Sequence, residues 1–206
     1  KLINWLTENK IIYSTNIELR KKSWLKAGGT VELFIQPESA EDTIKLIRFF
    51  INQKIKYYPV GNISNILFRD GLIKTPLINL KNIKEPIIQI NDDDKKNLYF
   101  KASSGLTLFK YVNFLQNHFS LSGQEGLIGI PGTIGGAIYT NASSYSSCIS
   151  DYLTKLEYIN SKGEIIVLEK EKLQFKWRYS IFHEKKDFLI LQVYFNFPLK
   201  NVENKE

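Results

Sequence analysis

The sequence is poor in the residues that build disulfides and metal sites. Its 206 residues include one cysteine, Cys148, two histidines and no Cys/His cluster. An internal disulfide is therefore impossible, an ordinary zinc site is excluded, and Cys148 is interpreted as a buried or inert thiol. There is no run of about eighteen apolar residues that could span a membrane, and residues 1–5 contain no secretory hydrophobic segment. We expect a globular cytoplasmic protein without a membrane contact.

Arginine is also scarce. The net charge is +7, yet only four of the 28 basic residues are Arg, and the cations are interleaved with acids along the chain. A nucleic-acid surface more often gathers its cations on one face, with Arg prominent. We therefore expect no nucleic-acid partner, although the positive field favours an anionic small-molecule ligand.

Two common signatures of nucleotide and metal binding are missing. Neither a Walker A sequence nor a Rossmann Gly-x-Gly-x-x-Gly occurs at a strand-to-helix turn. The acidic segment Asn91–Asn97 lacks the glycine and the terminal glutamate of a calcium loop. No metal is expected, and Asn91–Asn97 is interpreted as a solvated hairpin loop.

The first 80 residues show the pattern of an α/β unit. Alternating apolar residues predict strands, and Ser39 followed by Asp42 is a helix-capping signal. The expected elements are a helix over residues 2–9, a strand at Val31–Gln36, a helix from Ser39 to about Gln53, and strands at Lys56–Val60, Ile66–Phe68 and Pro76–Leu80.

The remainder is richer in strand signals. We expect a helix capped by Thr107, with His118 at its end, and strands at Ile87–Ile90, Leu98–Ala102, Tyr152–Asn160, Glu164–Leu168 and Phe188–Phe197. The last strand is apolar enough to be central in a sheet. The change in composition near residue 80 predicts two subdomains, 1–80 and 81–200, followed by a frayed tail over 201–206.

Glycine is concentrated in one place. Six of the twelve glycines lie between Gly123 and Gly136, around Pro131. Such a stretch either makes tightly packed turns or offers backbone N–H groups to a phosphate, and composition alone leaves the two interpretations equal. A second candidate loop, Gly61–Asn65, directly follows an expected strand, where ligands often bind.

One arginine has a distinctive setting. Arg178 lies among aromatic residues in the segment Phe175-Lys-Trp-Arg-Tyr-Ser-Ile-Phe182. A guanidinium there can bind a carboxylate or a phosphate, or it can stack on the rings for structure alone. The residues themselves do not separate these two roles.

At these places the chain resembles the UDP-N-acetylenolpyruvoylglucosamine reductases. Residues 130–137 with Asn141-Ala142 resemble that family's Ile-Pro-Gly-Thr-Val-Gly-Gly-Ala and Asn-Ala signature. Ser64-Asn65 resembles its Gly-Ser-Asn-Leu-Leu loop, and the Arg178 segment resembles its Phe-x-Tyr-Arg-x-Ser-x-Phe. Trp24 with Gly28-Gly29 falls where the family has a Trp followed by two glycines. The order agrees over roughly residues 14–197.

The resemblance implies an α+β, two-subdomain FAD-binding fold of the vanillyl-alcohol-oxidase (PCMH) type. It implies FAD as cofactor, NADPH as hydride source and an enolpyruvyl UDP-sugar as substrate, in peptidoglycan synthesis. Arg178 would be catalytic by polarising the substrate carboxylate, and Trp177 with Arg178 would bind substrate. The implied cofactor-binding residues are Gly61, Asn62, Ile63, Ser64, Asn65, Gly129, Ile130, Pro131, Gly132, Thr133, Gly135, Gly136, Ala137 and Asn141.

Two departures from the family pattern leave alternatives open. Ile63 replaces a glycine, and a β-branched residue suits a positive φ poorly. The family also continues into a substrate-binding domain with a serine proton donor, which would follow Glu206 and is lacking here. Three interpretations therefore stay open. The first is a reductase completed by residues outside this sequence or by a partner chain, and the second is a short FAD enzyme with another substrate. The third is a non-catalytic binding or assembly module without FAD. An enzyme is favoured.

Overall fold

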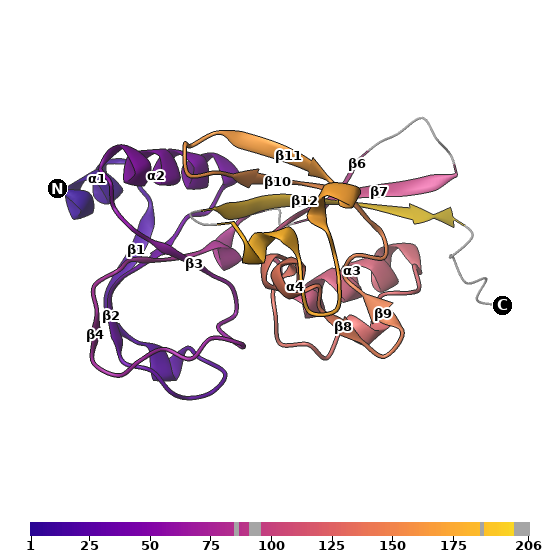
Figure 1. Ribbon diagram of the computed structural model, residues 1–206, viewed down its shortest axis with the longest axis horizontal. Helices are drawn as coiled ribbons and strands as arrows, with labels where there is room; N and C mark the ends of the chain where they lie inside the picture. The colour runs from indigo at the N-terminus through magenta and orange to yellow at the C-terminus, as the bar shows by residue number, and fades with distance from the viewer. Residues whose placement is uncertain (85–86, 91–95, 186–187, 200–206) are drawn as a thin grey trace.

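Two five-stranded sheets, packed beside one another, carry the helices of the fold (Figure 1). The computed structural model describes residues 1–84, 87–90, 96–185 and 188–199. The expected loop at Asn91–Asn97 falls largely outside these residues, and the expected tail at 201–206 falls wholly outside them. Within the described ranges, no helix has the length and apolarity needed to cross a membrane.

The first sheet has the order β1-β2-β5-β3, with β4 beside β2. Its strands are β1 (Ile12–Glu18), β2 (Thr30–Gln36), β3 (Tyr58–Val60), β4 (Leu72–Ile73) and β5 (Leu77–Asn79). The β1–β2 pair is antiparallel, whereas β2, β5 and β3 run parallel. The chain crosses from β2 to β3 through α2 (Ala40–Asn52), which confirms the expected α/β unit.

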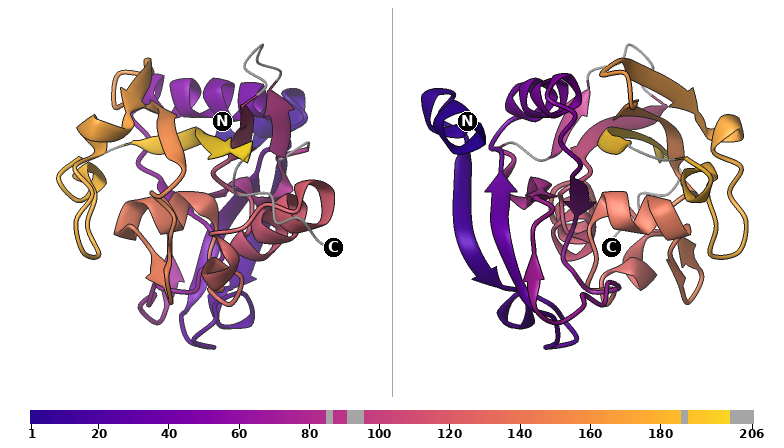
Figure 2. Two further views of the ribbon diagram at one scale, coloured as in Figure 1. Left: turned by 90° about the vertical axis from the view of Figure 1, so that its right-hand side faces the viewer. Right: turned by 60° about the vertical axis from the view of Figure 1, so that its left-hand side comes forward.

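Helix α2 forms as its sequence predicts. The Ser39 hydroxyl accepts a hydrogen bond from the Asp42 N–H at 3.0 Å, and two acidic residues occupy the first turn. Leu46, Ile47 and Phe50 repeat at helical spacing on the buried face. They join one apolar cluster with residues of both sheets, so α2 ties the two sheets together. The helix lies at the top of both views in Figure 2. Helix α1 (Leu2–Glu8) adds Leu6 to this cluster.

The second sheet is antiparallel, with the order β11-β10-β12-β7-β6. Its strands are β6 (Ile87–Ile90), β7 (Asn97–Ser103), β10 (Leu153–Ile159), β11 (Ile165–Glu169) and β12 (Leu189–Pro198). The apolar strand β12 is central, as expected. Helix α3 (Leu108–Phe119) begins at the Thr107 cap and packs below this sheet, where the Tyr111 and Phe195 rings lie 4.9 Å apart (Figure 1).

Three short regions differ from expectation. Residues 66–68 form no strand, and β4 pairs with β2 instead, so the expected strand at Ile66–Phe68 is wrong. Strand β1 was not expected, because polar residues interrupt its alternation. The glycine stretch contains helix α4 (Ile134–Thr140), where a loop was expected. The hairpin β8 (Ser143–Ser144) and β9 (Ser147–Cys148) follows it.

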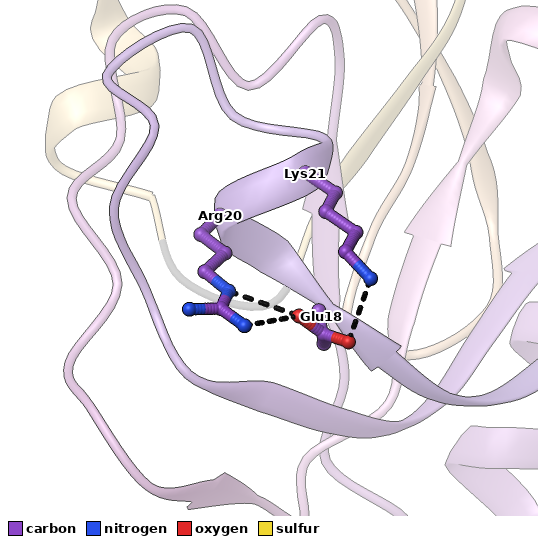
Figure 3. Close-up of polar contacts among 3 residues, drawn as sticks. All are labelled: Glu18, Arg20 and Lys21. Atoms are coloured by element: carbon purple, nitrogen blue, oxygen red, sulfur yellow. Dashed lines mark hydrogen bonds and ion pairs between the residues drawn. The ribbon is translucent and has the colours of Figure 1, made fainter.

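Single 3₁₀ turns connect the larger elements, and they are η1 (Leu19–Lys21), η2 (Leu80–Asn82), η3 (Glu125–Leu127), η4 (Lys170–Leu173) and η5 (Ile181–His183). At η1, Glu18 accepts hydrogen bonds from Arg20 and Lys21, both at 2.8–2.9 Å (Figure 3). The bond from Lys21, followed by that from Arg20, lowers the pKa of Glu18. These exposed pairs shape the turn but contribute little to stability.

The described strands of residues 12–79 pair only among themselves, and so do the strands of residues 87–198. We propose that the boundary expected near residue 80 separates two subdomains that share the α2 cluster. Leu189 and Leu191 of β12 belong to that cluster, so the second sheet packs on the helix that the first sheet carries.

Candidate functional site

A cavity of about 1010 Å³ is lined by segments of both sheets and of the glycine stretch. Its wall comes from five stretches of chain, at residues 57–66, 78–80, 104–108, 130–142 and 178–190. Pockets for small molecules measure roughly 300–1,000 Å³, so this volume suits a ligand as large as a dinucleotide. Among the described residues, no three His, Cys, Asp or Glu side chains gather where they could hold a metal ion.

One wall of the cavity is the loop Gly61–Asn65, which is held from below by a buried asparagine. Asn79 lies at the end of β5 and is only 3% exposed. Its Nδ2 donates to the carbonyl oxygens of Val60 at 3.2 Å and of Gly61 at 2.6 Å. Its Oδ1 accepts from the backbone N–H of Lys81 at 3.1 Å. Burying a side-chain amide without hydrogen-bond partners costs free energy. The three bonds of Asn79 are therefore kept, and they fix where the loop begins.

The two loops predicted separately meet in the structure. A Cβ atom on Gly61 would lie 2.3 Å from Oγ1 of Thr133, so only glycine permits this approach. Asn62 Nδ2 also donates to the carbonyl oxygen of Pro131 at 3.0 Å. The loop that follows β3 and the segment that precedes α4 therefore form one continuous wall.

The Gly61–Asn65 loop has backbone donors to offer. Within the described part of the chain, no acceptor bonds to the backbone N–H groups of residues 61–65. Groups of successive N–H donors in a turn bind anions such as phosphate. Lys81 Nζ lies beside this loop, 2.6 Å from Asn62 Oδ1. Burial lowers the pKa of Lys81, and the charges of Lys110 and Lys22 lower it further.

The second wall is the start of helix α4, whose N-cap is Thr133. Gly135 donates its N–H to the Ser104 carbonyl oxygen at 2.8 Å, and a Cβ on Gly135 would lie 2.9 Å from Cβ of Ser104. A Cβ on Gly136 would meet nothing closer than Thr133 Oγ1, at 3.7 Å. The two adjacent glycines thus do different things. Gly135 allows the helix to pack on the β7–α3 turn, and Gly136 leaves the cavity wall open.

Ile63 adopts the backbone conformation that was considered unfavourable for it. Its φ is +52°, and its side chain is 4% exposed in an apolar cluster with Val60 and Leu77. Its carbonyl oxygen accepts from the Trp24 N–H at 3.0 Å. A left-handed conformation costs an L-residue about 1–2 kcal/mol. Burying the side chain contributes about 1.5–3 kcal/mol, which offsets that cost.

Arg178 lies in a tight turn, which the Tyr179 N–H closes by donating to the Lys176 carbonyl oxygen at 3.2 Å. Its guanidinium carbon is 5.1 Å from the centre of the Trp177 ring, and its φ is +52°. Arg178 lines the cavity. Trp177 does not line it and is 80% exposed. The stacking contact is therefore present, and Arg178 also lines the cavity. Ligand binding by Arg178 stays a prediction.

The end of α4 holds the Arg178 turn in place. Asn141 Nδ2 donates to the Lys176 carbonyl oxygen at 3.1 Å, and Asn141 Oδ1 accepts from Sγ of the half-buried Cys148 at 3.1 Å. The Ser180 hydroxyl donates to the Tyr139 carbonyl oxygen at 2.8 Å. Asn141 thus fixes the turn, and its side chain does not line the cavity.

Most of the cofactor-binding residues implied by the resemblance line the cavity together. They are Gly61, Asn62, Ile63, Ser64, Asn65, Ile130, Pro131, Gly132, Thr133, Gly135, Gly136 and Ala137. Gly129 and Asn141 do not line it, and Gly129 borders a separate shallow hollow beside the β8–β9 hairpin.

Several lining residues belong to no motif noted in the sequence. They include Tyr57, Tyr58, Ser104, Gly105, Tyr139 and Phe188. Ser104-Gly105 stands between a strand and a capped helix, a pattern that could have identified it as a site turn. Nothing in the sequence marks Tyr139, because its place depends on how α4 packs.

Comparison with known proteins shows that the fold is a flavin-binding one of the PCMH type. Residues 31–169 match the model of a family described as "FAD binding domain". The chain belongs to that family.

Individual relatives point the same way. The chain is 31% identical, over 93% of its length and 61% of the relative's, to UDP-N-acetylenolpyruvoylglucosamine reductase of Listeria innocua. The crystal structure of that reductase from Thermus caldophilus covers 93% of this chain and 65% of its own, with 24% identity and a TM-score of 0.66. The crystal structure of p-cresol methylhydroxylase with substrate bound covers 96% of this chain and 42% of its own, with 12% identity and a TM-score of 0.61.

These matches confirm both the family resemblance and the PCMH-type fold. They also show that the chain spans about three-fifths of the length of the curated relatives it matches.

The two glycines of α4 provide a matched pair of variants. Gly135→Ala should lower the free energy of unfolding by about 1–3 kcal/mol, because its Cβ overlaps Ser104. Gly136→Ala should be neutral or stabilising by up to about 1 kcal/mol, since alanine favours a helix and meets open space. Urea unfolding of both variants checks this. Equal losses would contradict the assigned packing.

Ile63 can be tested with a second pair. Ile63→Ala and Ile63→Gly should each cost about 2–5 kcal/mol for the lost core side chain. The glycine variant should be the more stable of the two by about 0.5–1 kcal/mol, because it alone relieves the positive φ. This reverses the usual order of alanine and glycine. Urea unfolding of the two variants measures the order, and an alanine variant more stable than the glycine variant would argue against strain at residue 63.

Proposed function

We propose that this chain is the FAD-binding part of a reductase that converts UDP-N-acetylenolpyruvoylglucosamine to UDP-N-acetylmuramate with NADPH as hydride source. The observation that carries the proposal is the cavity between the loops Gly61–Asn65 and Ile130–Ala137, inside a chain of the FAD-binding-domain family. Such a protein would act in the cytoplasm, in the synthesis of the peptidoglycan precursor.

The residues present fit a flavin dinucleotide. Backbone N–H groups without described acceptors at residues 61–65 suit a diphosphate, and Lys81 beside them adds positive charge. The opposite wall has Gly136, where a planar ring system can approach the backbone closely. Apolar residues such as Leu108, Ile130 and Phe188 line the space between. When bound there, FAD would supply the hydride transfer that no side chain of this chain can perform.

Arg178 is the residue we assign to the reaction. Its guanidinium borders the cavity, and the tight turn, the Trp177 ring and Asn141 fix its position. A fixed cation beside an enolpyruvyl carboxylate stabilises negative charge that develops there, without having to reorganise first. Trp177, which is exposed next to it, would contact the substrate from outside the cavity.

Further substrate contacts and a proton donor are proposed to come from residues outside this sequence or from a partner chain, since the relatives are longer than the matched part. The alternative of a non-catalytic module without FAD rested on Ile63. The burial of Ile63 in the cluster beneath its loop removes that argument.

The first test is FAD binding by the purified chain. We expect the protein to bind FAD with a changed flavin spectrum and to unfold at a higher temperature in its presence. Gly136→Ala should weaken FAD binding by about tenfold or more while keeping a cooperative unfolding transition, because its methyl group occupies the ring's approach. No spectral change and no thermal shift with FAD would sink the proposal.

The second test separates substrates. NADPH should bleach the bound flavin, and UDP-N-acetylenolpyruvoylglucosamine should restore the colour when the residues outside this sequence are supplied. Recolouring by a different nucleotide sugar only would favour the alternative of another redox substrate. Arg178→Lys keeps the charge and serves as the matched variant of Arg178→Met.

A further inference from the structure

Lys81 lies beside the Gly61–Asn65 loop, where its Nζ donates to Asn62 Oδ1, and two lysines from other parts of the chain add their charges to it. None of the three lines the cavity itself. Lys22 follows η1, Lys81 lies in η2, and Lys110 lies in the first turn of α3. They are close enough for the charges of Lys110 and Lys22 to lower the pKa of Lys81. We call these residues the lysine cluster.

The lysine cluster is not neutralised by the described residues. In residues 1–84, 87–90, 96–185 and 188–199, no carboxylate forms an ion pair with Lys22, Lys81 or Lys110. The acceptor for Lys81 Nζ is the neutral amide oxygen of Asn62. Lys22 lies over the Phe34 ring, 5.6 Å from its centre. All three lysines are exposed, so the cost of leaving them unpaired is small. Like charges close to one another still repel, and an anion placed beside Lys81 would relieve that repulsion.

Lys81 is also joined to both cavity walls. Its ammonium donates to Asn62 Oδ1, and Asn62 Nδ2 donates in turn to the Pro131 carbonyl oxygen. Its own backbone N–H is fixed by Asn79, the residue that holds Gly61. The chain of contacts from Lys81 through Asn62 to Pro131 therefore sets both the position of the cation and the shape of the loop with free N–H donors.

We propose that Lys81 binds the diphosphate of the ligand at the Gly61–Asn65 loop. The proposal rests on the proposed function in taking FAD as the ligand. A nucleotide sugar carries the same diphosphate, but the link from Lys81 to Asn62 places the cation at the cofactor loop. The ammonium would supply charge, and the backbone N–H groups would supply direction.

The competing interpretation is that Lys81 only stabilises the loop. Comparing the binding of two ligands, with and without a diphosphate, separates this interpretation from diphosphate binding. FAD and riboflavin share the flavin ring, but only FAD has a diphosphate. Lys81→Met removes the charge, and Lys81→Arg keeps it. Lys162→Met is the matched control. It removes one positive charge from the exposed turn between β10 and β11, none of whose residues lines the cavity, whereas Lys81 bonds the lining residue Asn62.

The experiment measures dissociation constants of FAD and riboflavin, by flavin fluorescence, from low to high NaCl. Lys81→Met should raise the dissociation constant of FAD by about tenfold or more, as expected for a lost hydrogen bond to a charged group. The dissociation constant of riboflavin should change by less than about twofold. The variant should also flatten the salt dependence of FAD binding. Lys81→Arg and Lys162→Met should stay close to the unmodified protein.

Other results would overturn the assignment. Equal loss of FAD and riboflavin in Lys81→Met would show a structural role. Unchanged FAD affinity would exclude Lys81 from binding the FAD diphosphate. If UDP-N-acetylglucosamine binding to the FAD-loaded protein is lost instead, Lys81 binds the nucleotide sugar and the assignment is wrong. If the unmodified chain binds neither flavin, the proposed function is wrong, but the role of Lys81 is still to be decided. Inorganic pyrophosphate then decides this inference, since it should raise the unfolding temperature of the unmodified chain and not that of Lys81→Met.

Discussion

The contact between Gly61 and Thr133 is the constraint on which the candidate site depends. Gly61 follows a strand of the first sheet, and Thr133 caps the helix that packs under the second. Because no Cβ stands between them, the two loops touch and enclose one cavity. A side chain at Gly61 would push apart the Gly61–Asn65 loop and the helix whose first turn faces the same space.

The surrounding polar contacts keep that junction in register. Asn79 bonds the loop from beneath, Asn62 bonds across to Pro131, and Asn141 bonds the Arg178 turn to the end of α4. Buried or half-buried amides with several partners specify one geometry, because each unmade bond is costly. The apolar cluster around α2 then holds the two sheets so that these short-range contacts can form.

Much of the fold could be predicted from the sequence, because local signals and tertiary packing agree. Ser39 and Thr107 begin their helices as expected, and the apolar run of β12 lies at the centre of its sheet. Helix α4 was missed because two glycines oppose a helix locally. The Thr133 cap and the bond from Gly135 to Ser104 outweigh that preference.

The candidate site likewise has parts that the sequence predicts and parts that it does not. The two loops were recognisable as ordered motifs, and their residues gather at the cavity. The lysine cluster was not recognisable, because only folding brings the charges of Lys22 and Lys110 within range of Lys81, and nothing local distinguishes these residues from the other lysines. Asn141 was expected among the cofactor-binding residues, but its side chain bonds the Arg178 turn and does not line the cavity.

The most direct measurement is a crystal structure of the chain with FAD. The account predicts the diphosphate against the backbone N–H groups of residues 61–65 and the flavin ring beside Gly136, with the Gly61–Thr133 contact intact. FAD bound outside the cavity, or a cavity that opens at Gly61 and Thr133 to admit it, would contradict the account.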